Sequence, residues 1–467
     1  MLDQVAPELP PDLDWLNADQ PPQLTGSACA LAFISAGSNW CQQRLQELTE
    51  LQRRWSDRLQ VIAIHVPRFD YERNPERVCA ALGIAGIKLP VAMDPHWLLW
   101  QRFGIEAWPT VLLIDAKGQL RERIVGAGER QQLESKVAAF CADAPRVPLS
   151  AAGHGREPST SLRFPTGVTI QGGYLYVADS GHHRILECDL SGRILRQFGN
   201  GASDLVDGPA DLAAFRRPHG LSLQRGALYV ADTGNHAVRR IDLRSGDVVT
   251  LCGNGKAGMP GEGLVTAPTA ISMDAPRSLA LLGGELYIAN SGGNRLWSYD
   301  LGTRQMRLEA GSGMLAVRDG NGSMAAFAQP VSLSTVHHTL YICDEAGSAI
   351  RSFNARTGQV STLIGRDQWN FGRDDGARND ALLQAPQAIA LDPDAPLLWI
   401  ADTGNGLLRH LRLGGGELKT VELPEPLRGP TGLAVADGTV WIADTEAHAI
   451  WRLDKHTGAM RQVPVGE

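Results

Sequence analysis

The amino-acid sequence predicts two units of different fold class, an α/β unit followed by an all-β unit made of repeats. Apolar runs alternate with helical patterns as far as residue 141, and no helical pattern follows Pro145. From about residue 160 onward, one segment pattern occurs six times. Alternating strands and helices are typical of α/β layers, and a repeated all-strand unit is typical of a propeller.

The α/β unit is expected over residues 21–144, after a Pro- and Asp-rich extended lead-in at 1–20. Short apolar runs predict buried strands, and apolar residues at three- and four-residue steps, such as Leu45, Leu48 and Leu51, predict helices. The expected elements are a strand at 29–35, a helix at 40–57, a strand at 59–66, helices at 75–82 and 95–103, strands at 110–115 and 120–125, and a helix at 130–140.

The six repeats each contain an aromatic residue, small apolar residues and an acidic or amide turn residue. A proline precedes the aromatic residue by 11 positions in five repeats and by 13 in the fifth, and the repeats recur every 42–58 residues. Each carries about four strand-like segments, as many as one propeller blade. The pattern therefore predicts a six-bladed β-propeller over 161–467, with a linker at 145–160. The repeats span 176–190, 229–243, 287–301, 341–355, 399–413 and 441–455.

Composition and charge exclude several function classes. The net charge of −7 and a pI near 6.0 argue against nucleic-acid binding, which needs clustered positive charge. No run of 18 apolar residues predicts a membrane span, and no secretory signal is visible. The seven cysteines contain no CxxC pair, which argues against a zinc site or a disulfide framework. We therefore expect a cytoplasmic protein with no metal or cofactor, in which the cysteines other than Cys41 are small core residues.

Both halves resemble known families. The repeats resemble the NHL family of propellers, through Asn235-His236 in the second repeat, His182-His183 in the first, and Asn294, Asn405 and His448 in later ones. The first half resembles thioredoxin-like domains, through the segment 31–48 and the Trp108-Pro109-Thr110 element before a strand. The order of the two halves is similar to that of the NHL-repeat-containing protein 2 family over nearly the whole chain.

The resemblance implies a redox site at Ser38, Cys41 and Pro109, with Pro109 in a cis turn. The family has a cysteine where this chain has Ser38, so the attacking thiolate of a Cys-x-x-Cys pair is missing. Ordinary dithiol exchange is therefore not expected. Cys41 lies in the first turn of a predicted helix, where the helix dipole favours a thiolate. The alternatives left open are a peroxidase-like or mixed-disulfide thiol and a relic cysteine in a fold kept for binding.

A candidate ligand site follows from propeller geometry. Residues that enter the inner strands ring one mouth of the central channel, and here they form a mixed polar ring suited to a peptide or a small polar ligand. The ring residues are Thr166, His219, Arg277, Val331, Gln387 and Thr431. The Asp of each turn is expected to cap backbone groups rather than bind calcium. His183, His236 and His448 share one blade position, which favours a structural role over zinc.

The sequence therefore predicts a binding or scaffold protein whose propeller mouth meets a protein, a peptide or a small polar ligand. Its thioredoxin-like unit would be catalytically degenerate. The first alternative is a monothiol redox protein that acts through Cys41. The second is a hydrolase or lyase that uses the central channel of the propeller.

Overall fold

A computed structural model describes residues 4–18, 21–128, 130–147, 160–224 and 226–466. The chain divides into two compact units, Met1–Pro158 and Ser159–Glu467. Most of the predicted linker at 145–160 lies outside the described residues. No helix among the described residues is long and apolar enough to cross a lipid bilayer.

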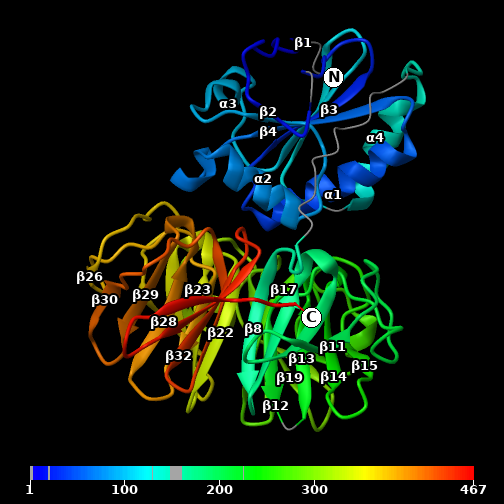
Figure 1. The fold of residues 1–467 in the computed structure, drawn as a ribbon. Helices are drawn as coiled ribbons and strands as arrows, with labels where there is room; N and C mark the ends of the chain where they lie inside the picture. Colours follow the sequence, from blue (N-terminus) through cyan, green and yellow to red (C-terminus); the bar gives the residue numbers. More distant parts are fainter. Residues whose placement is uncertain (1–3, 19–20, 129, 148–159, 225, 467) are drawn as a thin grey trace. The chain divides into compact units, whose positions relative to one another are not determined.

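The first unit is a seven-stranded mixed sheet with helices on it (Figure 1), as the alternating pattern predicted. Strands β3 and β4 pair in parallel at its centre, while β6 and β7 run antiparallel to their neighbours. The strand order is β1-β7-β6-β3-β4-β5-β2. The strands are β1 Gln4–Val5, β2 Trp15–Leu16, β3 Ala28–Ile34, β4 Leu59–His65, β5 Val91–Met93, β6 Thr110–Ile114 and β7 Gln119–Val125.

The helices bury apolar residues on both faces of this sheet. Alternate residues of β3 and β4 belong to two different clusters, because successive side chains of a strand point to opposite faces. Helices α1, α2 and α4 pack in one cluster, and α3 packs in the other with the lead-in segment. The helices are α1 Asn39–Arg54, α2 Pro75–Ile84, α3 Leu98–Arg102 and α4 Arg130–Ala142, with the short 3₁₀ helix η1 at Asp70–Arg73.

The lead-in is part of the sheet rather than a separate extended arm. Strand β1 pairs with β7 and strand β2 pairs with β5, so the two strands occupy the two edges of the sheet. Both are only two residues long, which is too short for a repeating apolar pattern to reveal them.

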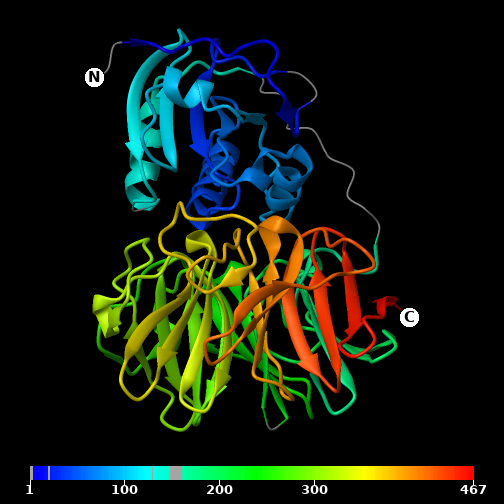
Figure 2. The same cartoon turned by 90° about the vertical axis from the view of Figure 1, so that its left-hand side faces the viewer.

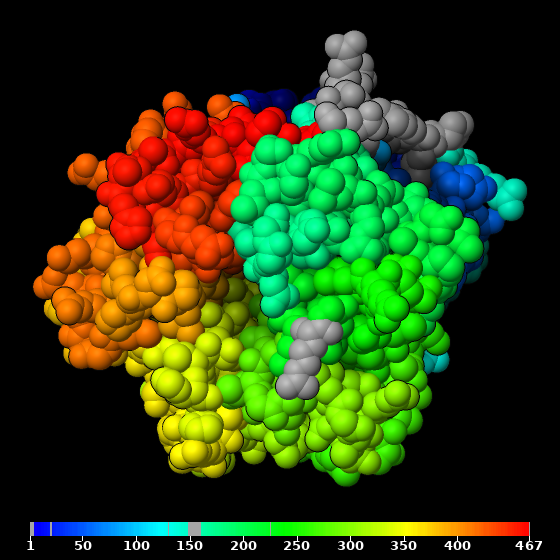
Figure 3. Space-filling view, turned by 60° about the horizontal axis from the view of Figure 1, so that its bottom comes forward, coloured from blue at the N-terminus to red at the C-terminus, as the bar shows by residue number. Residues whose placement is uncertain are grey.

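The second unit is a six-bladed propeller, and each blade is one antiparallel sheet built from a contiguous stretch of chain. The blades follow one another around the ring in sequence order, with the last beside the first (Figure 3). The six inner strands, each the first of its blade, are β8 Pro165–Gln171, β12 Leu221–Gln224, β17 Pro276–Leu282, β22 Pro330–Val336, β27 Ala388–Leu391 and β31 Pro430–Ala436.

The second strand of each blade carries the aromatic residue of the repeat and ends at the acidic or amide turn residue. These strands are β9 Tyr174–Asp179, β13 Ala227–Asp232, β18 Glu285–Asn290, β23 Thr339–Asp344, β28 Leu397–Asp402 and β32 Thr439–Asp444. The turn is a short 3₁₀ helix in the first, second, fourth and fifth blades, at η2 Ser180–His182, η3 Thr233–Asn235, η6 Glu345–Gly347 and η7 Thr403–Asn405.

The third and fourth strands complete each blade on the outside of the ring. The third strands are β10 Arg184–Asp189, β14 Ala237–Asp242, β19 Arg295–Asp300, β24 Ala349–Asn354, β29 Leu407–Arg412 and β33 Ala449–Asp454. The fourth strands are β11 Ile194–Phe198, β15 Val248–Cys252, β20 Met306–Ala310, β25 Gln359–Ile364, β30 Glu417–Thr420 and β34 Met460–Val463.

The loops between blades add minor elements. Three of them contribute a short fifth strand, namely β16 Leu264–Val265, β21 Gly320–Asn321 and β26 Gly376–Ala377, and two contain 3₁₀ helices, η4 Pro268–Ala270 and η5 Gly322–Met324.

The ring closes where the last blade meets the first (Figure 2). The Thr445 hydroxyl donates to the Pro165 carbonyl at 2.7 Å. The Ile194 N–H donates to the Gly466 carbonyl at 2.9 Å, and Gly466 N–H donates back to Gly192. The two ends of the propeller are thus joined by hydrogen bonds and packing.

Candidate functional site

The first candidate site is the start of helix α1. Ser38 is the N-cap of this helix, and its hydroxyl accepts the Cys41 N–H at 3.5 Å. This is the ordinary structural role of a serine before a helix. The Trp108–Pro109 peptide bond is cis, as the resemblance implied. Trp108 packs against the core cluster that contains Cys41.

Cys41 is fully buried, and its chemistry follows from that. Burial raises the pKa of the Cys41 thiol to about 12, the Ser35 and Ser38 hydrogen bonds and Arg44 lower it, and Glu72 raises it. The thiol is therefore neutral at pH 7. A neutral, solvent-inaccessible thiol is a weak nucleophile. The helix dipole, which favours a thiolate, is outweighed here by desolvation.

A buried carboxylate organises the loop before Ser38. Glu72 accepts hydrogen bonds from the Ser35 hydroxyl at 2.9 Å and the Gly37 N–H at 3.0 Å. Any side chain at Gly37 would collide with Glu72, since a Cβ there would lie 2.8 Å from its Oε1. The sequence alone gave no signal for this contact, because 35 residues separate the two positions.

His65 belongs to the same buried network. Its Nδ1 accepts the Ala36 N–H at 3.2 Å, and its Nε2 donates to the Glu72 carbonyl at 3.0 Å. Burial lowers the pKa of His65, so the ring is neutral. Both ring nitrogens are engaged in holding the loop.

Of the other six cysteines, five are buried as expected, and Cys79 is not. Cys79 is exposed on helix α2, whose buried side is formed by Val78 and Leu82 instead. The prediction that Cys79 is a core residue was therefore wrong. A ten-residue helix places adjacent positions on different faces, and only packing shows which face is covered.

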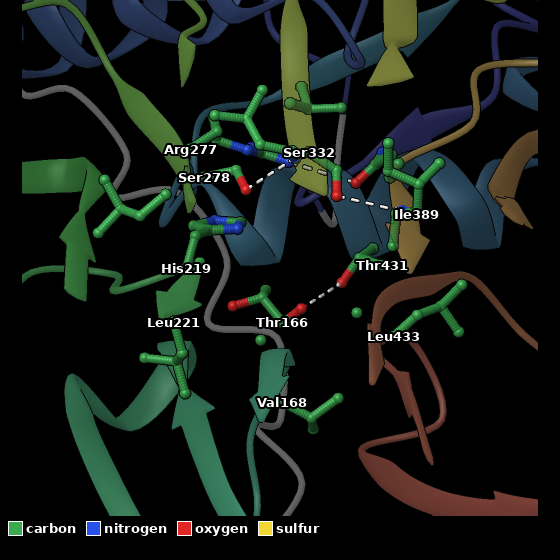
Figure 4. Close-up of a pocket in the computed structure, with 18 residues that line it drawn as sticks. Thr166, Val168, His219, Leu221, Arg277, Ser278, Ser332, Ile389, Thr431 and Leu433 are labelled. Atoms are coloured by element: carbon green, nitrogen blue, oxygen red, sulfur yellow. Dashed lines mark hydrogen bonds between the residues drawn. The ribbon is translucent and has the colours of Figure 1, made fainter. Parts of the chain in front are cut away.

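The second candidate site is the channel mouth of the propeller. The structure brings together all six predicted ring residues, one from each blade at or just before the start of its inner strand, around one pocket (Figure 4). Small residues follow one position further along each strand. A ring of aliphatic side chains follows next, made of Val168, Leu221, Leu279, Leu333, Ile389 and Leu433.

The hydroxyl groups of the mouth hold the blades together. The Thr166 hydroxyl shares a hydrogen bond with Ser180 and lies 3.1 Å from the Pro218 carbonyl. The Thr431 hydroxyl lies 3.3 Å from the Thr166 carbonyl and 2.5 Å from the Thr445 hydroxyl. These two threonines therefore have inter-blade partners already, and Val331 is apolar.

Three polar side chains remain in the ring. Arg277 donates to Gln387 Oε1 at 3.3 Å, and Gln387 donates to Glu345 Oε1 at 2.8 Å. His219 is 7% exposed, and its ring has no hydrogen-bond partner among the described residues. Burial and the nearby Arg277 and Arg217 lower the pKa of His219 well below its usual value, so the ring is neutral.

Sequence reasoning missed Arg217 and Glu345 at this mouth. Arg217 comes directly before Pro218, and burial together with Arg216 and Arg277 lowers its pKa to about 10. Glu345 stands where all five other repeats have Ser or Thr after the turn Asp or Asn. Glu345 therefore breaks the pattern of its repeat, which an alignment of the six repeats shows, whereas the position before the proline varies among the repeats and gives no signal for Arg217.

The turn Asp residues cap backbone N–H groups of neighbouring loops, as the sequence predicted. In every blade the turn Asp, or Asn290 in the third, accepts a backbone N–H from the loop that enters the blade, at 2.7–3.1 Å. In three blades it also pairs with a fully buried arginine of the third strand, Arg239, Arg351 or Arg409.

The histidines that share one blade position join neighbouring blades. Nδ1 of His183, His236 and His448 accepts the backbone N–H of Arg217, Ala275 and Phe164, respectively, at 3.0–3.1 Å. Asn294 and Ser348 do the same with their side-chain oxygens in the third and fourth blades, while the fifth blade has Gly406 at this position. Five of the six blades therefore place a side-chain acceptor here.

The two units define a class of protein in which a thioredoxin-like domain is followed by an NHL-repeat propeller. The NHL repeat family model matches residues 162–188, 215–241 and 427–453. The NHL repeat-containing protein 2 of Gallus gallus is 30% identical over 99% of this chain and 72% of that protein. The chain belongs to the NHL repeat-containing protein 2 family.

Two further relatives are informative. The protein SUPPRESSOR OF QUENCHING 1, chloroplastic, of Arabidopsis thaliana is 30% identical over 97% of this chain and 47% of that protein. The thiol-disulfide oxidoreductase YkuV of Bacillus subtilis (strain 168) is 29% identical over 29% of this chain and 93% of that protein, in the N-terminal part.

Proposed function

We propose that this chain is a binding protein whose propeller mouth receives a peptide or a small polar ligand, and whose thioredoxin-like unit does not carry out dithiol exchange. The observation that carries the proposal is the contrast between the two sites. Cys41 is a buried, neutral thiol behind a serine cap, whereas polar side chains from separate blades converge on one open pocket.

The pocket suits binding rather than catalysis. A hydrolase or lyase needs a base, a nucleophile or a metal at the reacting atoms. At the mouth, Glu345 is hydrogen-bonded to Gln387, and His219 is neutral, with no carboxylate of the described part of the chain bonded to its ring. We infer that the ring recognises a ligand by charge and hydrogen bonding.

The redox half of the proposal is tested by alkylation of the native protein with iodoacetamide from pH 6 to 10, followed by peptide mass spectrometry. Cys79 is exposed and serves as the internal control. We expect Cys79 to be labelled in the native protein and Cys41 only after unfolding. Rapid native labelling of Cys41 with an apparent pKa well below about 8.5 would instead support the monothiol redox alternative.

The binding half is tested by selecting peptides from a random display library on the full chain, and on the Arg277→Gln variant in parallel. We expect peptides that are enriched on the wild-type protein and not on the variant. Enrichment that is identical on both proteins, or none at all, would contradict the mouth as a peptide-binding site.

A further inference from the structure

The mouth contains a mostly buried polar side chain for which the described residues provide no hydrogen-bond partner. His219 is more than nine-tenths buried, no hydrogen bond to its ring is found among the described residues, and the ring points into the pocket (Figure 4). Buried polar groups nearly always have a partner, and each exception needs an explanation. A ligand that fills the pocket would supply the missing acceptor or donor.

Arg277 lies beside His219 and also has N–H donors without an acceptor among the described residues. A guanidinium group has five N–H donors, and Arg277 uses one, to Gln387 at 3.3 Å. Among the described residues it has no carboxylate within ion-pair distance, and burial lowers its pKa. A partly buried guanidinium charge without a carboxylate attracts an anion.

The charges around the two side chains are unequal. Arg217 lies close enough to affect both His219 and Arg277 and adds a second positive charge. Glu345 is hydrogen-bonded to Gln387 and also lies close enough to Arg277 to raise its pKa. Two arginines and one carboxylate at the rim favour an anionic ligand over a cationic one.

The deeper part of the channel limits what enters. Beyond the small residues, the ring of six aliphatic side chains offers no polar partner to a charged group, so a carboxylate would stay at the level of His219 and Arg277. The inter-blade hydrogen bonds of Thr166 and Thr431 keep this rim in place from the opposite side.

We propose that the propeller mouth is a carboxylate-binding subsite, in which the Arg277 guanidinium and a ring N–H of the neutral His219 donate to the two carboxylate oxygens. The inference rests on the proposed binding function and specifies its ligand class. The carboxylate belongs either to a free small acid or to the C-terminus of a peptide.

The test compares two probes that differ only in the charged group, N-acetylglycine and N-acetylglycinamide, by calorimetric titration into the full chain. We expect N-acetylglycine to bind and N-acetylglycinamide not to bind. The Arg277→Gln variant should have an affinity for N-acetylglycine that is lower by about tenfold or more. Arg240→Gln, which removes an arginine on an outer part of the second blade, is the control and should leave the affinity unchanged.

A second readout reports on His219 itself. Its ring proton signal, assigned with His219→Asn, should shift on addition of the acid and not of the amide. Equal binding of acid and amide, no binding of either, or full binding of the acid to Arg277→Gln would each overturn the proposal. Tighter binding of inorganic phosphate than of N-acetylglycine would also overturn it.

The source of the carboxylate is distinguished by two further probes, acetate and N-acetyl-trialanine with a free C-terminus. A tenfold or greater gain for the peptide over acetate identifies a peptide terminus, and equal affinity identifies a small acid. Selected peptides that depend on the mouth without any carboxylate preference would leave the proposed function standing and sink this inference. Carboxylate binding without selected peptides would support this inference and restrict the proposed function to a small polar ligand.

Discussion

At the scale of single residues, one blade position shows how a side chain can be replaced if its chemical role is kept. His236 occupies a left-handed backbone conformation, with φ 50°, and accepts the Ala275 N–H of the next blade. Asn294 has φ 51° and accepts the equivalent N–H one blade later. Asn tolerates this conformation better than most residues and offers a carbonyl oxygen as acceptor.

This equivalence gives a pH prediction. Burial, with Arg217 and Arg216, lowers the pKa of His236 from 6.5 to about 4. His236 is therefore protonated below about pH 6.5 in the unfolded chain but only below about pH 4 in the folded chain. As the pH falls from about 6.5 toward 4, proton binding to the unfolded chain lowers the free energy of unfolding. We expect His236→Asn to raise the free energy of unfolding by roughly 2 kcal/mol relative to wild type at pH 5, and to change it little at pH 7.5.

Urea unfolding at the two pH values measures this gain. His236→Ala is the matched variant, because it removes the same titrating group but leaves the Ala275 N–H without its acceptor. It should lose about 1–3 kcal/mol at pH 7.5. An unchanged pH dependence in His236→Asn would refute the role assigned to this histidine.

The cap of helix α1 gives a second prediction at this scale. Ser38→Cys restores a thiol one helical turn from Cys41, so a mild oxidant such as diamide should remove both free thiols by forming a disulfide. The reduced variant should lose about 1 kcal/mol of stability, because a thiol caps a helix poorly. Thiol titration and intact mass measure the first effect, and urea unfolding measures the second.

Ser38→Ala is the control, with the same loss of stability and no change on oxidation. If Ser38→Cys formed no disulfide, the positions of Ser38 and Cys41 would not correspond to a redox pair, and the resemblance of this site to a dithiol centre would fail.

At the scale of elements, three blades are held by the same buried ion-pair unit. In the fourth blade, Arg351 pairs with Asp344 at 3.1 Å and with Asp319 of the preceding loop at 2.9 Å. Asp319 also accepts the hydroxyl and N–H of Thr362 on the outer strand. The second and fifth blades repeat this with Arg239 and Arg409. Asp207, Asp319 and Asp375 thus each connect the loop before a blade to the third strand of that blade.

The two ends of this unit differ in exposure, and the expected losses differ accordingly. Arg351→Met leaves the fully buried Asp344 without its countercharge and should lose about 3–5 kcal/mol. Asp319→Asn acts at a half-exposed position and should lose about 1 kcal/mol or less. Guanidinium unfolding of both variants checks the order, which equal losses would contradict.

The fourth blade also shows compensation between neighbouring positions. In four blades the hydroxyl after the turn Asp donates to the carbonyl of the next blade's proline. Glu345 stands at this position and has no hydroxyl, and the Cys343 thiol donates to the Pro386 carbonyl at 3.0 Å instead. The inter-blade contact is therefore kept, while Glu345 accepts a hydrogen bond from Gln387 of the mouth.

At the scale of the whole propeller, ring closure depends on the last residues of the chain. Val465 is buried in the cluster shared by the first and last blades, and Gly466 exchanges two hydrogen bonds with the turn at Gly192 and Ile194. Truncation after Pro464 should therefore lower the free energy of unfolding by about 3 kcal/mol, because it removes one buried valine and two hydrogen bonds.

Chemical unfolding of the full chain followed by intrinsic tryptophan fluorescence measures this loss. Deletion of Glu467 alone is the control and should have no effect. A truncation after Pro464 that unfolds like the full chain would show that side-chain contacts alone close the ring.

The sequence by itself determined the architecture, because both signals are local and periodic. Six repeats, five of them with the same proline-to-aromatic spacing, predict equivalent blades, and three- and four-residue apolar steps such as Leu45 to Leu48 predict helices with one buried face. The positions that line the mouth followed from the same register, since each ring residue comes directly after the proline of its repeat.

Only the tertiary structure decided which of those residues are available to a ligand and which are already used. Thr166 and Thr431 bond to neighbouring blades, whereas His219 and Arg277 face the pocket, and residues far apart in the chain determine this difference. The state of Cys41 was decided in the same way. A helix start favours a thiolate, but burial and the carboxylate of Glu72, which comes from another segment, favour the neutral thiol. Desolvation and charge act through space, and a linear pattern contains no record of either.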